Sequence, residues 1–298
     1  IMLATFLLGI ALGSYLFSLA ARHLKIDLTV FCFLQILTGF FALLSMNFFN
    51  DMPYYFVQLF KVTHGTGLKF EFGKFLLASI VMLPPTLLIG AMFACFIHIY
   101  RKFQPLGSEI GQAYFTNTLG TILGSVLTGF VLIPLIGIRY TLLAAAGINI
   151  AIGVILIFWA RSELKGLRRI IAVVLFGLVA WSLVSMKAWN INLITSDIAV
   201  KPSQRVGLSK KKLAYSLGER ELIFYKEGTN ATVTVAKSRD NLSLAVNGKV
   251  DASNADTFTQ FLLGHLPMML HKDPRNVLVI GVGSGSTMAA VASYPIEK

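Results

Sequence analysis

Long apolar runs fill the first 186 residues of the chain and are separated only by short polar stretches. A helix needs about 20 mainly apolar residues to cross a bilayer. Candidate spans lie at 1–20, 28–48, 73–99, 112–138, 140–160 and 169–186. The pattern therefore predicts an α-helical, multi-span membrane region of about six spans.

Prolines and small residues add detail to these spans. Pro84-Pro85 lies in the middle of the third run, where it predicts a kink or a break because proline has no N–H to donate. Gly9 and Gly13, like Gly120 and Gly124, have the four-residue spacing that lets helices pack closely. Helix packing accounts for these positions. A substrate path is the alternative, and the scarcity of ionisable side chains inside the spans weakens it.

From residue 221 onward the pattern changes to short runs of β-branched and aromatic residues. These runs predict strands at 222–225, 232–235 and 242–246. Asn247-Gly248, directly after the third run, is a strong signal for a tight hairpin. We therefore expect a small β-domain over residues 221–255.

A helix and a glycine-rich turn follow the predicted β-domain. The helix has apolar residues at helical spacing, with Ser253 or Asn254 as its N-cap and Asp256 in its first turn. The unbroken apolar run 276–280 is typical of a buried parallel strand. It leads straight into the glycine-rich turn, and we expect a second helix to start near Thr287.

Composition supports a membrane protein and argues against both a soluble globular domain and a disordered chain. Apolar residues make up 55% of the 298 residues and charged residues 13%, against about 25% charged in soluble domains. Disorder is excluded because it needs low hydrophobicity and high charge. The two cysteines lie in apolar runs, which leaves no disulfide framework or thiol–metal cluster, and we expect no metal.

The charges are unevenly distributed, and this places the domain boundaries. Residues 1–186 carry 12 basic and 5 acidic side chains, whereas the remaining 112 residues carry 14 and 9. We therefore assign 1–186 to the membrane, 187–220 to a basic juxtamembrane linker, 221–255 to the β-domain and 256–298 to the first part of a cofactor-binding domain. The net charge of +12 fits loops that face anionic lipid better than it fits nucleic-acid binding.

The two ends of the sequence suggest a longer polypeptide. The first residues already lie in an apolar run without the basic start of a signal peptide. The last residues follow one strand–turn–helix unit, whereas a doubly wound fold needs several more strands. We expect the sequence to be a fragment missing both ends.

The turn Gly281-Val282-Gly283-Ser284-Gly285 carries the clearest chemical signal. A glycine-rich turn between a strand and a helix lets backbone N–H groups come close to a nucleotide-like ligand. Its G-x-G-x-G spacing lacks the later glycine of the dinucleotide fingerprint. The spacing is more typical of S-adenosylmethionine-type ligands than of NAD.

Several motifs together resemble the spermidine synthases (polyamine aminopropyltransferases), in particular the bacterial branch fused to a multi-span membrane region. The motifs are Val246-Asn247-Gly248, Asp251-Ala252-Ser253, Ser253–Thr257, Leu266-Pro267-Met268, Gly281–Gly285, Pro84–Ala91 and Asn117–Gly120. The resemblance implies a Rossmann-like α/β domain of the methyltransferase type, truncated here. It also implies an enzyme that transfers an aminopropyl group from decarboxylated S-adenosylmethionine to an amine such as putrescine.

The resemblance also assigns roles to individual residues. The cofactor-binding residues would be Asn230, Gly281, Gly283, Ser284 and Gly285. Asp251 and Asp256 would lie near the amine substrate, and the general-base aspartate of the family would lie beyond Lys298. Two positions depart from the family: Phe261 stands where a histidine contacts the acceptor, and Ser284 stands where an aspartate holds a cationic amine.

These departures leave alternative functions open. One is a methyltransferase that uses intact S-adenosylmethionine on a membrane-associated substrate, and another is a transporter with a ligand-sensing domain. The expected partners are a lipid bilayer and a small-molecule amine, with no nucleic acid, and self-association stays open. A count of six spans would place the C-terminal part outside the cytoplasm. Because the cofactor is made in the cytosol, we expect instead a cytoplasmic C-terminal domain on a bacterial inner membrane.

Overall fold

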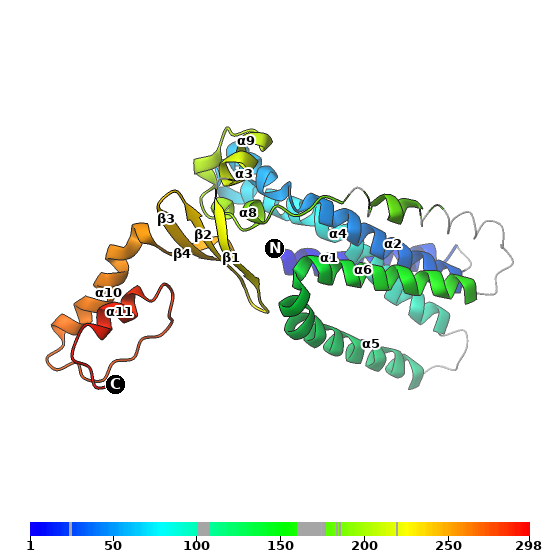
Figure 1. Ribbon diagram of the computed structural model, residues 1–298. Helices are drawn as coiled ribbons and strands as arrows, with labels where there is room; N and C mark the ends of the chain where they lie inside the picture. Colours follow the sequence, from blue (N-terminus) through cyan, green and yellow to red (C-terminus); the bar gives the residue numbers. More distant parts are fainter. Residues whose placement is uncertain are drawn as a thin grey trace. The chain divides into compact units, whose positions relative to one another are not determined.

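The chain folds into two compact units, Ile1–Trp189 and Asn190–Lys298 (Figure 1). The computed structural model describes residues 1–23, 26–100, 108–159, 174, 177–182, 184, 186–218 and 220–298. The main elements of the first unit are α1 (Met2–Ala20), α2 (Leu28–Phe48), α3 (Met52–Thr63), α4 (Gly67–Tyr100), α5 (Ser108–Val126), the π-helix η1 (Leu127–Leu132) and α6 (Ile133–Trp159).

Four helical stretches of the described chain are long and apolar enough to cross a membrane, judged by length and composition. They are Met2–Ala20, Leu28–Phe48, Gly67–Tyr100 and Gly111–Phe158. The last has 48 residues, enough for two crossings of about 20 residues each. Its backbone leaves the helical conformation at Gly137, and the chain reverses direction between α5 and α6 (Figure 1). Half of the expected span 169–186 falls outside the described residues.

Glycines bring α1 and α4 into direct backbone contact. A Cβ atom on Gly13 would collide with the main chain of Leu87, and one on Gly90 would collide with the main chain of Ile10. The hydroxyl of Ser14 donates a hydrogen bond to the Gly90 carbonyl at 3.0 Å. The close packing predicted from the spacing of Gly9 and Gly13 is confirmed, since a Cβ on Gly9 would meet Thr86.

Among the described residues, α5 shows no such packing. No atom of the described chain lies within 4 Å of a Cβ placed on Gly120 or Gly124. Two hydroxyl groups of this helix donate to its own backbone, Thr121 to the Asn117 carbonyl at 2.8 Å and Ser125 to the Ile122 carbonyl at 2.9 Å. Local bonding satisfies these polar groups, so they do not need a neighbouring helix.

Helix α4 continues through Pro84-Pro85, so the expected break does not occur. Pro85 cannot donate to the carbonyl of Val81, four residues earlier, and an unpaired carbonyl would be costly in an apolar setting. The hydroxyl of Ser45, on α2, donates to that carbonyl at 2.8 Å. A neighbouring helix thus supplies the hydrogen bond that the proline removes.

The second unit contains a four-stranded antiparallel sheet in the order β1-β2-β3-β4. Its elements are α8 (Ile191–Ile194), the 3₁₀ turns η2 (Asp197–Ala199) and η3 (Pro202–Arg205), α9 (Lys210–Gly218), β1 (Glu221–Glu227), β2 (Thr232–Ser238), β3 (Asn241–Val246), β4 (Lys249–Ser253), the 3₁₀ turn η4 (Asn254–Asp256), α10 (Thr257–Leu270) and α11 (Ser286–Ala292). The three predicted strands are confirmed, and β4 was not predicted.

The predicted hairpin at Asn247-Gly248 is also confirmed. Both residues have positive φ angles, 50° and 80°, as a tight two-residue turn requires. The Asn247 side chain accepts a hydrogen bond from the Thr232 backbone N–H at 2.9 Å, which ties the turn to the start of β2.

The segment 276–280 is extended, but the prediction that it is a buried strand is wrong for the described chain. Leu278 is 84% exposed and Ile280 is 91% exposed. The Val277 N–H donates to the Lys298 carbonyl at 2.9 Å, which is not a strand ladder. A buried parallel strand needs neighbouring strands on its edges. The four strands of the described sheet pair with one another instead.

The proline compensation in α4 can be tested with a double-mutant cycle. Ser45→Ala should lower the free energy of unfolding by about 1–3 kcal/mol, because the Val81 carbonyl loses its partner. In a Pro85→Ala background the restored backbone N–H can bond to that carbonyl, so Ser45→Ala should cost much less. Unfolding of the full-length protein in detergent measures both, and equal costs in the two backgrounds would contradict this account.

Candidate functional site

The glycine-rich turn presents an open stretch of backbone between the extended segment 276–280 and α11. Gly281, Gly283 and Gly285 have φ angles of 91°, 55° and 79°, which glycine adopts far more readily than other residues. No described atom lies within 4 Å of a Cβ placed on any of the three. The absence of side chains therefore keeps the backbone of the turn accessible to a ligand.

Helix α10 holds this turn through hydrogen bonds that a single residue, Gln260, accepts. The side-chain carbonyl of Gln260 accepts a hydrogen bond from the Ser284 hydroxyl. The main-chain carbonyl of Gln260 accepts one from the Thr287 hydroxyl at 3.0 Å. The hydroxyls of Ser284 and Ser286 are 2.9 Å apart, so the middle and the end of the turn are joined as well. The turn is thus fixed to α10 on both sides of Gly285.

Helices α10 and α11 pack against each other at Gly264. A Cβ on this residue would lie 2.5 Å from the Cβ of Ala290 and 2.7 Å from the Thr287 carbonyl oxygen. Both distances are too short for a real side chain, so only glycine allows this approach. Ala290 and Met268 are buried in the contact. The start of α11, and the turn before it, therefore depend on this contact.

Aromatic side chains of α10 contact one another and a tyrosine that follows α11. The Nδ1 atom of His265 lies 3.2 Å from the Tyr294 hydroxyl, and the ring of His265 stacks on Phe261 with centroids 6.1 Å apart. Phe261 occupies the position where the family resemblance implies a histidine. Here its ring packs along α10 against His265.

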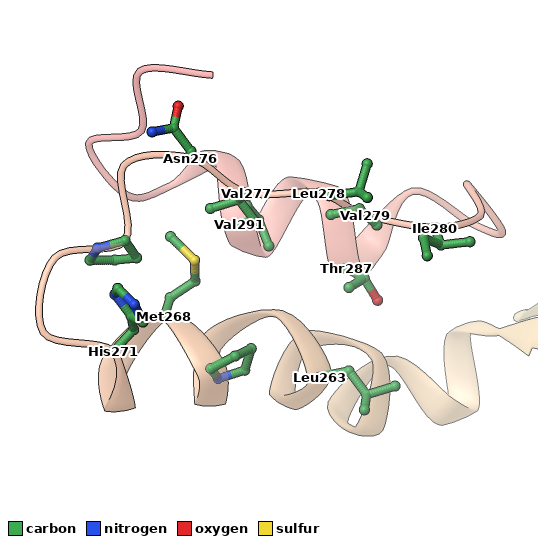
Figure 2. A pocket seen from close by; sticks show the side chains of 12 residues that line it. Leu263, Met268, His271, Asn276, Val277, Leu278, Val279, Ile280, Thr287 and Val291 are labelled. Carbon is green, nitrogen blue, oxygen red and sulfur yellow. The ribbon is translucent and has the colours of Figure 1, made fainter.

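An apolar cleft of about 410 Å³ lies between α10, α11 and the extended segment (Figure 2). Met268 points into it from α10, and Leu263, Val277, Val279 and Val291 also line it. The volume falls within the range of small-ligand sites. Its lining offers few polar groups, so the cleft suits the apolar surface of a ligand better than a charged group.

The other predicted site residues have separate local environments. Asn230 is exposed in the turn between β1 and β2, and Asp251 on β4 forms an ion pair with Lys249 at 3.1 Å. Asp256 is exposed and lies in the first turn of the 3₁₀ helix η4, whose N-cap is Ser253, so the predicted cap and first turn are confirmed for η4. The α-helix α10 follows directly, with Asp256 as its N-cap. The described contacts do not join these three residues to the glycine-rich turn.

Tyr225 and Glu227 form a polar pair on β1, a contact that the sequence pattern did not predict. The phenol of Tyr225 donates a hydrogen bond to the Glu227 carboxylate across one residue of β1. Burial raises the pKa of Tyr225 above its ordinary value, and the neighbouring carboxylate raises it further. The phenol therefore stays protonated near neutral pH and acts as a donor.

The described residues include no group of three or more His, Cys, Asp or Glu side chains arranged to hold a metal ion. The polar groups that the turn itself presents are its backbone amides and the hydroxyls of Ser284 and Ser286, beside the Gln260 side-chain amide.

Comparison with known proteins identifies relatives along the whole chain. It is 24% identical over 97% of its length to a polyamine aminopropyltransferase from Oceanobacillus iheyensis, covering 55% of that protein. It is 22% identical over its full length to polyamine aminopropyltransferase 2 from Aquifex aeolicus, covering 53% of it. A shorter match, 27% identical over 87 residues, links it to spermidine synthase from Dictyostelium discoideum.

These matches confirm the resemblance to the polyamine aminopropyltransferases that the motifs indicated. The chain spans about half the length of the first two relatives. No family model matches the chain, and no solved structure matches it.

The contact at Gly264 can be tested by adding one methyl group. Gly264→Ala should lower the stability of the second unit by about 1–3 kcal/mol, because the new Cβ has no room against Ala290. Gly218→Ala on α9 is the matched control, since no described atom lies within 4 Å of its added Cβ. Denaturant unfolding of the full-length protein measures both, and equal effects would show that the contact does not limit the packing.

Proposed function

We propose that the chain is part of a membrane-bound, spermidine synthase-like polyamine aminopropyltransferase. It would transfer an aminopropyl group from decarboxylated S-adenosylmethionine to an amine acceptor such as putrescine. The relatives along the whole chain support the reaction class, and the four apolar helices support a membrane location. The proposal places the protein in a bacterial inner membrane with its C-terminal domain in the cytoplasm, where the co-substrate is made.

The observation that carries the proposal is the open backbone of the glycine-rich turn. We propose that Gly281, Gly283 and Gly285 let the adenosyl part of the co-substrate approach the main chain, and that residues 256–298 begin a Rossmann-like domain. Asn230 would add an amide contact to the same ligand. Ser284 would hold the turn through Gln260 and would contact the ligand with a neutral hydroxyl.

The reaction requires a neutral amine to attack the carbon next to the sulfonium. A carbon–nitrogen bond forms as the carbon–sulfur bond breaks, methylthioadenosine leaves, and the nitrogen loses a proton to a base. A carboxylate near the acceptor favours binding of the cationic amine. Asp256 suits this role better than Asp251, because it has no ion-pair partner in the described chain whereas Asp251 is paired with Lys249.

Methyl transfer from intact S-adenosylmethionine is a second candidate, favoured by one observation. The turn carries the neutral Ser284 where the resemblance implies an aspartate, and this serine bonds to a neutral amide. A neutral pair gives a cationic aminopropyl group less electrostatic stabilisation than a carboxylate would. The reaction products separate the two candidates: methylthioadenosine for aminopropyl transfer and S-adenosylhomocysteine for methyl transfer.

The decisive experiment uses full-length protein in detergent with decarboxylated S-adenosylmethionine and putrescine. We expect methylthioadenosine and spermidine to form in equal amounts, measured by liquid chromatography with mass detection. Gly283→Val should lower this activity by about 100-fold or more, because valine resists the positive φ angle and blocks the open backbone.

Gly207→Val is the matched control for that variant. Gly207 also has a positive φ angle, 88°, and no described atom lies within 4 Å of its added Cβ, so the backbone strain is comparable. It should keep most of the activity because it lies outside the turn. Formation of S-adenosylhomocysteine from intact S-adenosylmethionine, with no product from putrescine, would replace the first candidate by the second.

A further inference from the structure

Helices α3 and α4 of the first unit form a hairpin. Helix α3 begins at Met52, shortly after α2 ends at Phe48, and residues 64–66 connect it to α4. His64 and Gly65 have positive φ angles, 56° and 69°, so the chain reverses within a short turn. We call residues 52–74 the α3–α4 hairpin and residues 61–69 its tip.

The inner faces of the hairpin pack against each other. The ring of Phe70 on α4 contacts those of Phe56 and Phe60 on α3, with centroids 5.7 and 6.1 Å apart. A Cβ on Gly73 would lie 2.2 Å from the side chain of Leu59, so the two helices touch there. The hairpin is therefore held in shape by its own residues, and its outer side chains are available to another surface.

Apolar side chains are exposed at the tip and beyond it. Val62 is 77% exposed and Leu68 is 88% exposed. Leu68, Phe72, Leu76 and Ile80 follow one another at intervals of four residues along α4, and all four are exposed. Residues at this spacing form a stripe along one side of a helix. The apolar stripe thus runs from the tip into the length of α4 that is a candidate membrane span.

The length of α4 places its first turns near the lipid headgroups. A helix of 34 residues is about 51 Å long, whereas a bilayer measures about 40–45 Å with its headgroup regions. A tilt within the usual range, up to about 40°, fits the helix into that thickness. Tyr54 and Tyr55 in α3 are aromatic residues of the kind that favour the membrane–water interface.

The charges of the tip favour an anionic surface. The tip contains Lys61 and Lys69, both exposed, and no acidic residue. Glu71 is the only acidic residue of the sequence 52–74, and Lys74 pairs with it at 2.6 Å. Because this acidic side chain is already paired with Lys74, the two tip lysines give the tip a net positive charge that attracts anionic lipid.

We propose that the tip of the α3–α4 hairpin binds the surface of an anionic lipid bilayer. Val62 and Leu68 enter the boundary between headgroups and acyl chains, and Lys61 and Lys69 bind lipid phosphates. Apolar burial and electrostatic attraction are the two terms that hold amphipathic segments at anionic membranes. Lipid is the partner because the stripe of the tip is continuous with the span. The inference rests on the proposed membrane location, and it does not depend on the transferase reaction.

Spin labels on introduced cysteines test this placement in the full-length protein. Leu68→Cys labels the tip, Ile80→Cys labels the same stripe further along α4, and Ser238→Cys labels the exposed end of β2. The wild type, whose Cys32 and Cys95 are fully buried, gives the background. Each protein is reconstituted in phosphatidylglycerol or in phosphatidylcholine. Collisions of the label with oxygen and with a water-soluble nickel chelate report its depth.

In phosphatidylglycerol we expect the label at position 68 at the headgroup boundary, the label at 80 deeper and the label at 238 in water. A water-exposed label at 68 beside an immersed label at 80 would overturn the proposal and leave the membrane location intact. Labels in water at both positions would overturn the membrane location as well. A label at 68 that is shielded from both oxygen and nickel would show a protein contact at the tip, and this would also overturn the proposal.

The tip lysines should determine the preference for anionic lipid. Lys61→Gln together with Lys69→Gln should lower the ratio of immersed to water-exposed label at position 68 by about 30-fold, about fivefold for each lysine. Replacing phosphatidylglycerol by phosphatidylcholine should cause a similar loss without these substitutions. An unchanged depth of the label at position 80 checks that the double variant folds and inserts.

The matched control removes the same charge from the second unit. Lys237→Gln together with Lys272→Gln replaces two exposed lysines and should change the ratio by less than about twofold, because the tip keeps its own lysines. An equal effect of the two double variants would show that net charge, and not the tip, determines the depth. Equal immersion of the tip in both lipids, with no effect of the tip lysines, would likewise overturn the proposal.

Discussion

The contact between α10 and α11 at Gly264 determines the geometry of the candidate site. Because no side chain separates the helices there, α11 begins directly beside Gln260, and this residue can bond to both Ser284 and Thr287. The glycine-rich turn is thereby held at two points while its three glycines stay open. A rigid anchor beneath an accessible backbone is a suitable arrangement for binding a nucleoside without reordering the loop.

In the membrane unit, as at the turn, glycines allow close contact and hydroxyl groups form the hydrogen bonds across it. Backbone carbonyls in apolar surroundings need donors, and small residues let neighbouring helices supply them. Ser45 serves the carbonyl that Pro85 leaves unpaired, and Ser14 reaches the carbonyl of Gly90 where α1 and α4 touch. Hydroxyl groups are therefore the donors in both places, to main-chain carbonyls in the membrane unit and to the two carbonyl groups of Gln260 at the turn.

Local signals in the sequence predicted much of the second unit. The strands, the Asn247-Gly248 hairpin and the start of α11 depend on neighbours in sequence, so their patterns were readable. Strand β4 was missed because Lys249–Ser253 is only five residues long and has just two apolar residues, Val250 and Ala252, although polar and apolar positions alternate in it. The burial of 276–280 was mispredicted because a segment is buried as a strand only where other strands pair with its edges, and its own residues do not report those partners. The Gln260–Ser284 hydrogen bond joins residues that are 24 positions apart in the sequence, and no local pattern reports such a contact.

The central claim is that the glycine-rich turn binds the adenosyl group common to both candidate reactions. Amide hydrogen exchange on the full-length protein, with and without methylthioadenosine, tests this most directly because it needs no turnover. The account predicts slower exchange at residues 281–287 and little change in β1 to β4, and Gly283→Val should abolish the effect. Binding of methylthioadenosine with no protection of residues 281–287 would contradict it.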